Sequence, residues 1–130
     1  MRGPYLVLLV GAVALLALVG LAAIYPGATL NRLAAIDSHQ RVTALPYGPL
    51  PRQRLDVYAP HSSASNGGHP VVVFFYGGSW NRGERADYRF VGEALAARGV
   101  IALVADYRLY PEVRYPDFLA DSALALAYGL

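Results

Sequence analysis

The sequence predicts an α/β fold in which an antiparallel hairpin leads into parallel strands with crossover helices, preceded by one transmembrane helix. Two apolar runs predict the sheet: Val71–Phe75 and residues 100–105 have the length and β-branched content of buried strands. Each run is followed by a segment with apolar residues at helical spacing. This order favours parallel strands joined by right-handed crossovers. An uncharged N-terminal stretch predicts the membrane helix.

That stretch carries no charged residue from Gly3 to Asn31, and residues 5–25 are almost entirely apolar. At about 1.5 Å per residue it can cross a hydrocarbon core of about 30 Å. We therefore predict a membrane anchor over residues 1–27 and a linker over residues 28–40. A cleaved signal segment is the alternative. Its apolar region is usually about 7–15 residues long, so the length of this stretch favours the anchor, whereas the small residues Ala22, Ala23, Gly27 and Ala28 favour cleavage.

The charges around this segment indicate its orientation. Arg2 precedes it, and Arg32, Asp37 and Arg41 follow it. The positive-inside rule mildly favours an N-terminus in the cytoplasm. The remaining domain would then be periplasmic or extracellular; a reversed anchor, or secretion after cleavage, is the alternative.

Residues 41–130 form the predicted domain. Residues 41–47 and 52–59 are predicted to pair as a hairpin, and the second strand alternates apolar and polar residues as a half-buried strand does. Residues 61–70 are polar and predict a surface loop. A helix is predicted over residues 86–98, ending at Gly99, and a second one begins near Pro116.

Composition excludes several classes of function. The net charge is +2 without a basic block, so nucleic-acid binding has no electrostatic basis. The chain has no cysteine, which excludes disulfides and thiolate zinc sites. Histidine and carboxylate residues do not occur at metal-ligand spacing, and no phosphate-binding glycine motif is present. We therefore expect no metal and no cofactor.

The chemically informative segment is Tyr76-Gly77-Gly78-Ser79-Trp80, which directly follows an apolar strand. Consecutive glycines let the backbone turn sharply and approach a ligand closely. The backbone N–H groups at such a turn can stabilise a developing negative charge. A glycine pair after a strand is usually only a turn, so the segment requires support from its surroundings.

That support is a second motif. VVVFFYGGSW is followed by a helix, a strand and then Ala105-Asp106-Tyr107-Arg108-Leu109-Tyr110-Pro111-Glu112; Tyr115-Pro116 and Asp121 come next. Together these features resemble the esterase/lipase branch of the α/β-hydrolases, from about Val42 to the last residue. Its hormone-sensitive-lipase-like and feruloyl-esterase-like carboxylesterases both fit. The resemblance implies an incomplete α/β-hydrolase sheet.

The resemblance also implies roles for individual residues. Gly78 and Ser79 match the positions whose N–H groups form part of the oxyanion hole, and Gly77 matches the glycine of the turn. Trp80 would line the substrate cleft, with core packing an equal alternative. Tyr76 stands where the family usually has a loop-organising histidine, and its hydroxyl can make one hydrogen bond from that place.

Acidic and basic residues of the second motif are expected to have structural roles. Asp106 and Arg108 would brace the loops behind the site, and we prefer a buried or half-buried ion-pair network for these two residues and Glu112. Asp121 is expected to be structural rather than catalytic.

The catalytic serine, acid and histidine of the family are absent from these 130 residues. No Gly-x-Ser-x-Gly elbow occurs, and the elbow would precede the acid and the histidine. His39, His61 and His69 all lie before the glycine segment, and the last two are expected to be solvated. The missing strand would pair with Val71–Phe75, whose apolar edge is otherwise open.

We therefore expect the N-terminal part of a membrane-anchored serine carboxylesterase or lipase-like hydrolase that supplies half of the oxyanion hole. Its substrate would be a small-molecule carboxylic ester, its membrane contact would be the N-terminal helix, and these residues alone would be inactive. The alternative is a truncated, non-catalytic membrane protein that acts through a partner at the open strand edge. A weaker third possibility is that only the anchor has a function.

Overall fold

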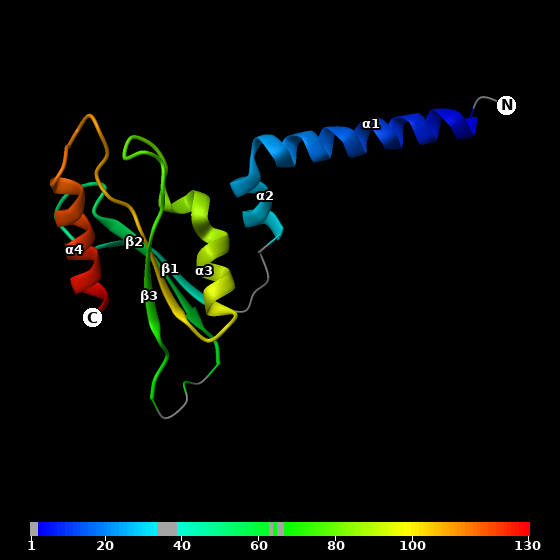
Figure 1. Cartoon of the computed structure of the whole chain (residues 1–130). Helices are drawn as coiled ribbons and strands as arrows, with labels where there is room; N and C mark the ends of the chain where they lie inside the picture. The colour runs from blue at the N-terminus through cyan, green and yellow to red at the C-terminus, as the bar shows by residue number, and fades with distance from the viewer. Residues whose placement is uncertain (1–2, 34–38, 63, 65–66) are drawn as a thin grey trace.

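The computed structural model describes residues 3–33, 39–62, 64 and 67–130 (Figure 1). In chain order the elements are α1 (Gly3–Ile24), α2 (Pro26–Leu33), β1 (His39–Pro46), β2 (Arg54–Pro60), β3 (Val71–Phe75), η1 (Arg85–Tyr88), α3 (Arg89–Ala96), β4 (Ile101–Ala105) and α4 (Asp117–Gly129). Part of the predicted linker, residues 28–33, is helical, and residues 34–38 lie outside the described residues.

The strands form one mixed sheet in the order β1-β2-β4-β3. β1 pairs antiparallel with β2, β2 pairs antiparallel with β4, and β3 runs parallel to β4. Phe75 and Leu55 are both paired with Ala105, one on each side of β4. The predicted hairpin and the predicted parallel pair are both confirmed.

One face of the sheet is covered by α3 and the other by α4 (Figure 1). On the α3 face, Tyr58, Ala102 and Val104 pack against Ala96. The helix approaches closely because residue 92 is glycine: a Cβ there would lie 2.3 Å from the Tyr58 ring.

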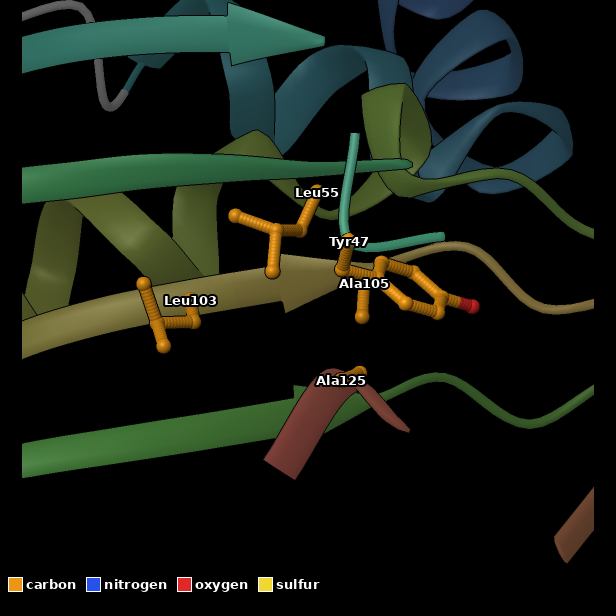
Figure 2. Packing of buried hydrophobic residues seen from close by; sticks show 5 residues of the cluster. All are labelled: Tyr47, Leu55, Leu103, Ala105 and Ala125. Carbon is orange, nitrogen blue, oxygen red and sulfur yellow. The ribbon is translucent and has the colours of Figure 1, made fainter. Parts of the chain in front are cut away.

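On the α4 face, Leu55 of β2 and Leu103 and Ala105 of β4 form a core with Tyr47 and Ala125 (Figure 2). Leu103 and Ala105 alternate along β4 with the residues that face α3, as the period of two requires. All of β4 after Ile101 is therefore buried, as predicted for this strand.

β2 is buried on both faces, so the prediction of a half-buried strand is wrong. Asp56 and Tyr58, expected to face solvent, are 2% and 0% exposed. Tyr58 is covered by α3, and Asp56 accepts hydrogen bonds from Arg41 and Arg85. The alternation of residue types was misleading because a carboxylate and a phenol can be buried when partners surround them.

β3 is a strand, as predicted, but it is not buried on both faces. Its one neighbour in the described sheet is β4, and Val71 and Val72 are 46% and 39% exposed. The expected open apolar edge is therefore present.

The predicted first helix begins as η1 and continues as α3. Gly99 follows it with φ +80°, and the Val100 N–H bonds to the Leu95 carbonyl, so the expected glycine stop is confirmed. Pro116 immediately precedes α4, as predicted.

The N-terminal helices differ from the single expected span. Among the described residues no single helix has the length and apolar composition needed to cross a membrane. Val10–Ile24 and Pro26–Arg32 together have this length and composition, but the chain bends by 109° between these two helices. Asn31 fastens α2 to the domain: its Nδ2 donates to the Ala86 carbonyl at 2.9 Å, and its Oδ1 accepts from the Phe90 N–H at 2.8 Å.

Candidate functional site

The glycine loop, residues 76–83, follows the carboxyl end of β3. Several of its residues have a left-handed backbone conformation. Gly78, Ser79 and Trp80 have φ values of 143°, 54° and 64°. A Cβ on residue 78 would lie 2.2 Å from the Arg82 carbonyl oxygen, so only glycine fits there. Left-handed non-glycine residues cost about 1–3 kcal/mol each and persist where their surroundings impose them. The sequence predicted the turn but not this conformation at Ser79 and Trp80.

A pocket of about 220 Å³ opens at this loop. Its lining consists of all five residues of the predicted segment together with one residue that sequence reasoning missed: Tyr76, Gly77, Gly78, Ser79, Trp80 and Tyr107. Within the described part of the chain, the backbone N–H groups of Gly77, Gly78 and Ser79 donate no hydrogen bond. These N–H groups thus have no partner within the described chain, and the residues that carry them line the pocket.

Trp80 lines the pocket and is not part of the core. It is 50% exposed, stacks on Phe118 with 5.0 Å between ring centroids, and meets the edge of Tyr107 at 5.8 Å. Its carbonyl accepts the Tyr110 N–H at 2.8 Å, which ties the loop to the segment after β4.

Tyr76 organises the base of the loop. Its buried hydroxyl donates to Asp106 Oδ1 at 2.7 Å and accepts from Arg52 Nη2 at 2.9 Å, so it makes two hydrogen bonds where one was expected. Its carbonyl accepts the Tyr107 hydroxyl at 2.7 Å, and its ring lies between Tyr88 and Tyr107. Burial and the bond to Asp106 raise the pKa of Tyr76, so the phenol stays protonated and is no base.

Behind the loop, Arg85 joins two buried carboxylates. Its Nε donates to Asp56 Oδ1 at 2.8 Å, its Nη1 is paired with Asp106 Oδ2, and its backbone N–H donates to Asp106 Oδ1 at 2.7 Å. Burial opposes ionisation of Asp56, but hydrogen bonds from Ala44, Arg85 and Arg41 outweigh burial and lower its pKa. The ion pair between Arg85 and Asp106 confirms the role predicted for Asp106.

Arg108 belongs to a second, separate ion pair with Asp121. The two side chains are bidentate, and the Arg108 N–H also donates to Asp121 at 2.9 Å. Gln53 adds a bond to Asp121, whose side chain is fully buried; its structural role stays a prediction. Burial acts against the charge of Asp121, yet the Arg108 and Gln53 bonds lower its pKa. Glu112 is exposed and pairs with no described residue, so its predicted place in the network is wrong.

Neither His61 nor His69 gives this site a base. His69 is partly buried, and its ring nitrogens lie 2.8 Å from the Gly99 carbonyl and 3.0 Å from that of Ser62. It was expected to be solvated, but it joins two loops at the amino ends of β3 and β4, opposite to the glycine loop. His61 is exposed, as expected. Among the described residues, no group of histidine and acidic side chains is placed to hold a metal ion.

Sequence reasoning missed Arg52, Arg85 and Asp56 as parts of this site. They come from a turn, a 3₁₀ helix and a strand that contribute nothing to the two motifs. A second and larger pocket, of about 460 Å³, lies between α2 and η1 and includes Tyr25 and Phe90 in its lining. It contains none of the predicted site residues.

The family model described as BD-FAE matches residues 55–129, more than half of the chain. Isoprenylcysteine alpha-carbonyl methylesterase of Arabidopsis thaliana is 37% identical over 91 residues, which cover 70% of this chain and 21% of that protein. Esterase LipC of Mycobacterium tuberculosis is 37% identical over 84 residues, covering 64% of this chain and 21% of that protein. The chain thus spans about a fifth of the length of these relatives.

Solved esterase structures share the fold. Esterase B from Lactobacillus rhamnosis superposes with a TM-score of 0.65 at 27% identity, over 87% of this chain and 38% of the other. A hyperthermophilic esterase from Pyrobaculum calidifontis has a TM-score of 0.62 at 27% identity, over 79% of this chain and 33% of the other.

Proposed function

The chain belongs to the BD-FAE family of esterase-like α/β-hydrolases, and on this premise we propose that it is the N-terminal part of a membrane-anchored serine carboxylesterase. The observation that carries the proposal is the glycine loop: backbone N–H groups without hydrogen-bond partners in the described chain line a pocket at the carboxyl end of β3. Ligands of open α/β sheets bind at that edge.

In this proposal the Gly78 and Ser79 N–H groups stabilise the oxyanion. A serine from outside these residues attacks the ester carbonyl carbon while a histidine, also from outside them, takes the serine proton, and the carbonyl electron pair moves to the oxygen that the two N–H groups hold. The histidine then gives this proton to the leaving alcohol. Collapse of this intermediate expels the alcohol, and water then releases the acid from the serine. Trp80 would contact the substrate from the pocket wall.

The substrate class rests on the relatives. Two of them are named as a methylesterase and an esterase, which supports a small-molecule carboxylic ester as the substrate of the complete protein. The described pocket is small, and residues outside this chain would complete it.

The test is to express the gene from the codon for Met1 to its natural stop codon and to measure hydrolysis of a short-chain nitrophenyl ester. We expect turnover by that product, a Gly-x-Ser-x-Gly elbow followed by an acid and a histidine in its sequence, and no turnover by the 130 residues alone. A gene product without the elbow, or turnover by the 130 residues alone, would refute the proposal.

We further propose that the N-terminal helices anchor the protein with the domain outside the cytoplasm. The uncharged sequence from Gly3 to Asn31 and the exposure of apolar residues such as Leu16 and Leu18, at 72% and 65%, support this proposal. A reporter phosphatase that is active only outside the cytoplasm, fused after Leu130, should be active and should sediment with membranes. An inactive fusion would reverse the orientation, and a soluble, shortened one would indicate a cleaved signal.

A non-catalytic role is the second candidate, and the exposed edge of β3 favours it. Val71 and Val72 could pair with a strand of another protein. Isolation of a stable complex with a specific partner, together with a stop codon directly after Leu130, would support this role over the esterase.

A further inference from the structure

Arg52 lies in the turn between β1 and β2, three residues ahead of the part of the chain that the family model matches, and its guanidinium group reaches the glycine loop. Its Nη2 donates to the Tyr76 hydroxyl at 2.9 Å and to the Gly83 carbonyl at 2.9 Å. Its Nε donates to the Tyr107 carbonyl at 2.8 Å. One side chain therefore holds the first residue of the loop, the last residue of the loop and the chain after β4.

The Arg52 contacts lie on either side of the residues whose backbone conformation is intrinsically least favourable. Ser79 and Trp80, both left-handed, lie between the two residues that Arg52 holds. Such residues keep their conformation only when their surroundings impose it. Gly83 also packs against the Tyr76 ring, where a Cβ would lie 2.9 Å from two ring carbons, so the two ends of the loop are in direct contact.

The Tyr76 hydroxyl completes the arrangement. It accepts from Arg52 and donates to Asp106, whose carboxylate is fixed in turn by Arg85. Arg52 Nη2 lies 3.9 Å from Asp106 Oδ1, so its charge faces the carboxylate without a direct bond. The planar guanidinium of Arg52 can donate at once to its three acceptors, the Tyr76 hydroxyl and the Gly83 and Tyr107 carbonyls. A lysine ammonium, in contrast, is a point charge on a flexible stem.

We propose that Arg52 is a positioning residue, which sets the place of the Gly78 and Ser79 N–H groups by holding both ends of the glycine loop. It does not touch the pocket and acts through Tyr76 and Gly83. The expected effect of Arg52 on the catalytic rate rests on the proposed esterase function. Its expected effect on the loop conformation does not.

The loop contains the one tryptophan of the chain, so Trp80 fluorescence reports on it directly. In the 130-residue chain, Arg52→Lys should shift the emission of Trp80 and increase its quenching by acrylamide. Arg54→Lys is the matched control, because Arg54 bonds to the Ala44 carbonyl and contacts no loop residue. It should leave both signals unchanged. A folded Arg52→Lys chain with wild-type emission and quenching would overturn the proposal.

If Arg52→Lys does not fold, as judged by circular dichroism, Tyr76→Phe provides the second variant. It removes the hydroxyl that joins Arg52 to the start of the loop and keeps the ring stack. We expect the same direction of change in Trp80 fluorescence, and unchanged fluorescence would equally overturn the proposal.

In the complete gene product, Arg52→Lys should lower kcat for a nitrophenyl ester about 10²-fold, the effect of a displacement of about 1 Å, with KM changed less than about twofold. A loss confined to KM would mean that Arg52 does not position the N–H groups. Absence of wild-type turnover would refute the proposed function, and Trp80 fluorescence would still decide the role of Arg52.

Discussion

Replacement of Arg85 by methionine tests whether the charge network behind the glycine loop stabilises the fold. Arg85 is the shared cation of Asp56 and Asp106, which are 2% and 5% exposed. Methionine has a similar length but no charge, so Arg85→Met removes the cation and keeps most of the packing.

The expected loss in free energy of unfolding depends on the partners that the two carboxylates keep in Arg85→Met. Removal of one partner of a buried ion pair costs about 3–5 kcal/mol, because the other charge remains buried. Asp56 keeps Arg41 at 3.0 Å, and Asp106 keeps the Tyr76 hydroxyl at 2.7 Å and Arg52 at 3.9 Å. We therefore expect the lower end of that range, about 3 kcal/mol, near neutral pH.

The loss should depend on pH. In the wild type the pKa of Asp56 is lowered, so its stabilising effect is complete above the unfolded pKa of about 3.9 and is lost as pH falls through the lower folded pKa. Without Arg85, Asp56 loses one of the hydrogen bonds that lower its pKa, so its pKa is higher than in the wild type and protonation relieves the buried charge at a higher pH. The difference in free energy of unfolding between the two proteins should therefore be smaller at about pH 4 than at about pH 7.

Urea unfolding followed by Trp80 fluorescence at both pH values measures this difference. Arg98→Met is the control: Arg98 is exposed just after α3, and within the described chain its side chain bonds only to the Ala94 carbonyl, so its loss should cost under about 0.5 kcal/mol. Equal losses in the two variants, or a loss in Arg85→Met that is the same at both pH values, would refute the reasoning.

Three further substitutions test other parts of the structure. Gly92→Ala places a Cβ 2.3 Å from the buried Tyr58 ring, and thermal unfolding should show a net loss of about 1–2 kcal/mol because overpacking outweighs the better helix propensity of alanine. Asp121→Asn removes a fully buried charge with a lowered pKa; urea unfolding should show a loss of at least about 2 kcal/mol near neutral pH that decreases below about pH 4. Gly78→Ala brings a Cβ 2.2 Å from the Arg82 carbonyl, and assays of the complete enzyme should show a fall in kcat of about 10² or more.

Each of these has a matched control. A Cβ on Gly67 meets nothing within 4 Å, so Gly67→Ala should be close to neutral in both glycine tests. Asp117 lies exposed on the same helix as Asp121, and Asp117→Asn should cost under about 1 kcal/mol. A glycine or aspartate variant that behaves like its control would contradict the contact assigned to it.

The sequence predicted elements whose residues are constrained locally. The strand at residues 101–105 is apolar because both of its faces are covered, and Gly99 and Pro116 mark helix ends because of their own backbone restrictions. The glycine segment and the Asp106 motif were found for a related reason, since each stands directly after a strand. All five residues of that segment line one pocket.

Contacts between distant segments could not be predicted. Arg85 and Asp56 are 29 residues apart, and Arg52 and Gly83 are 31 apart, so nothing in the sequence pairs them. The burial of Tyr58 was missed for the same reason, because it depends on a helix that packs across the sheet. His69 appeared solvated since its two acceptors are backbone carbonyls, which every residue possesses.

The strand order also has a consequence for synthesis. β2 and β3 are made first, yet they do not pair with each other, because β4 lies between them. At about 5–20 residues per second, the ribosome delivers Ile101–Ala105 a few seconds after Phe75. Until then Val71–Phe75 lacks the strand with which it pairs in the finished sheet. β2 and β3 can therefore become parts of one sheet only after β4, which pairs with both of them, has been made.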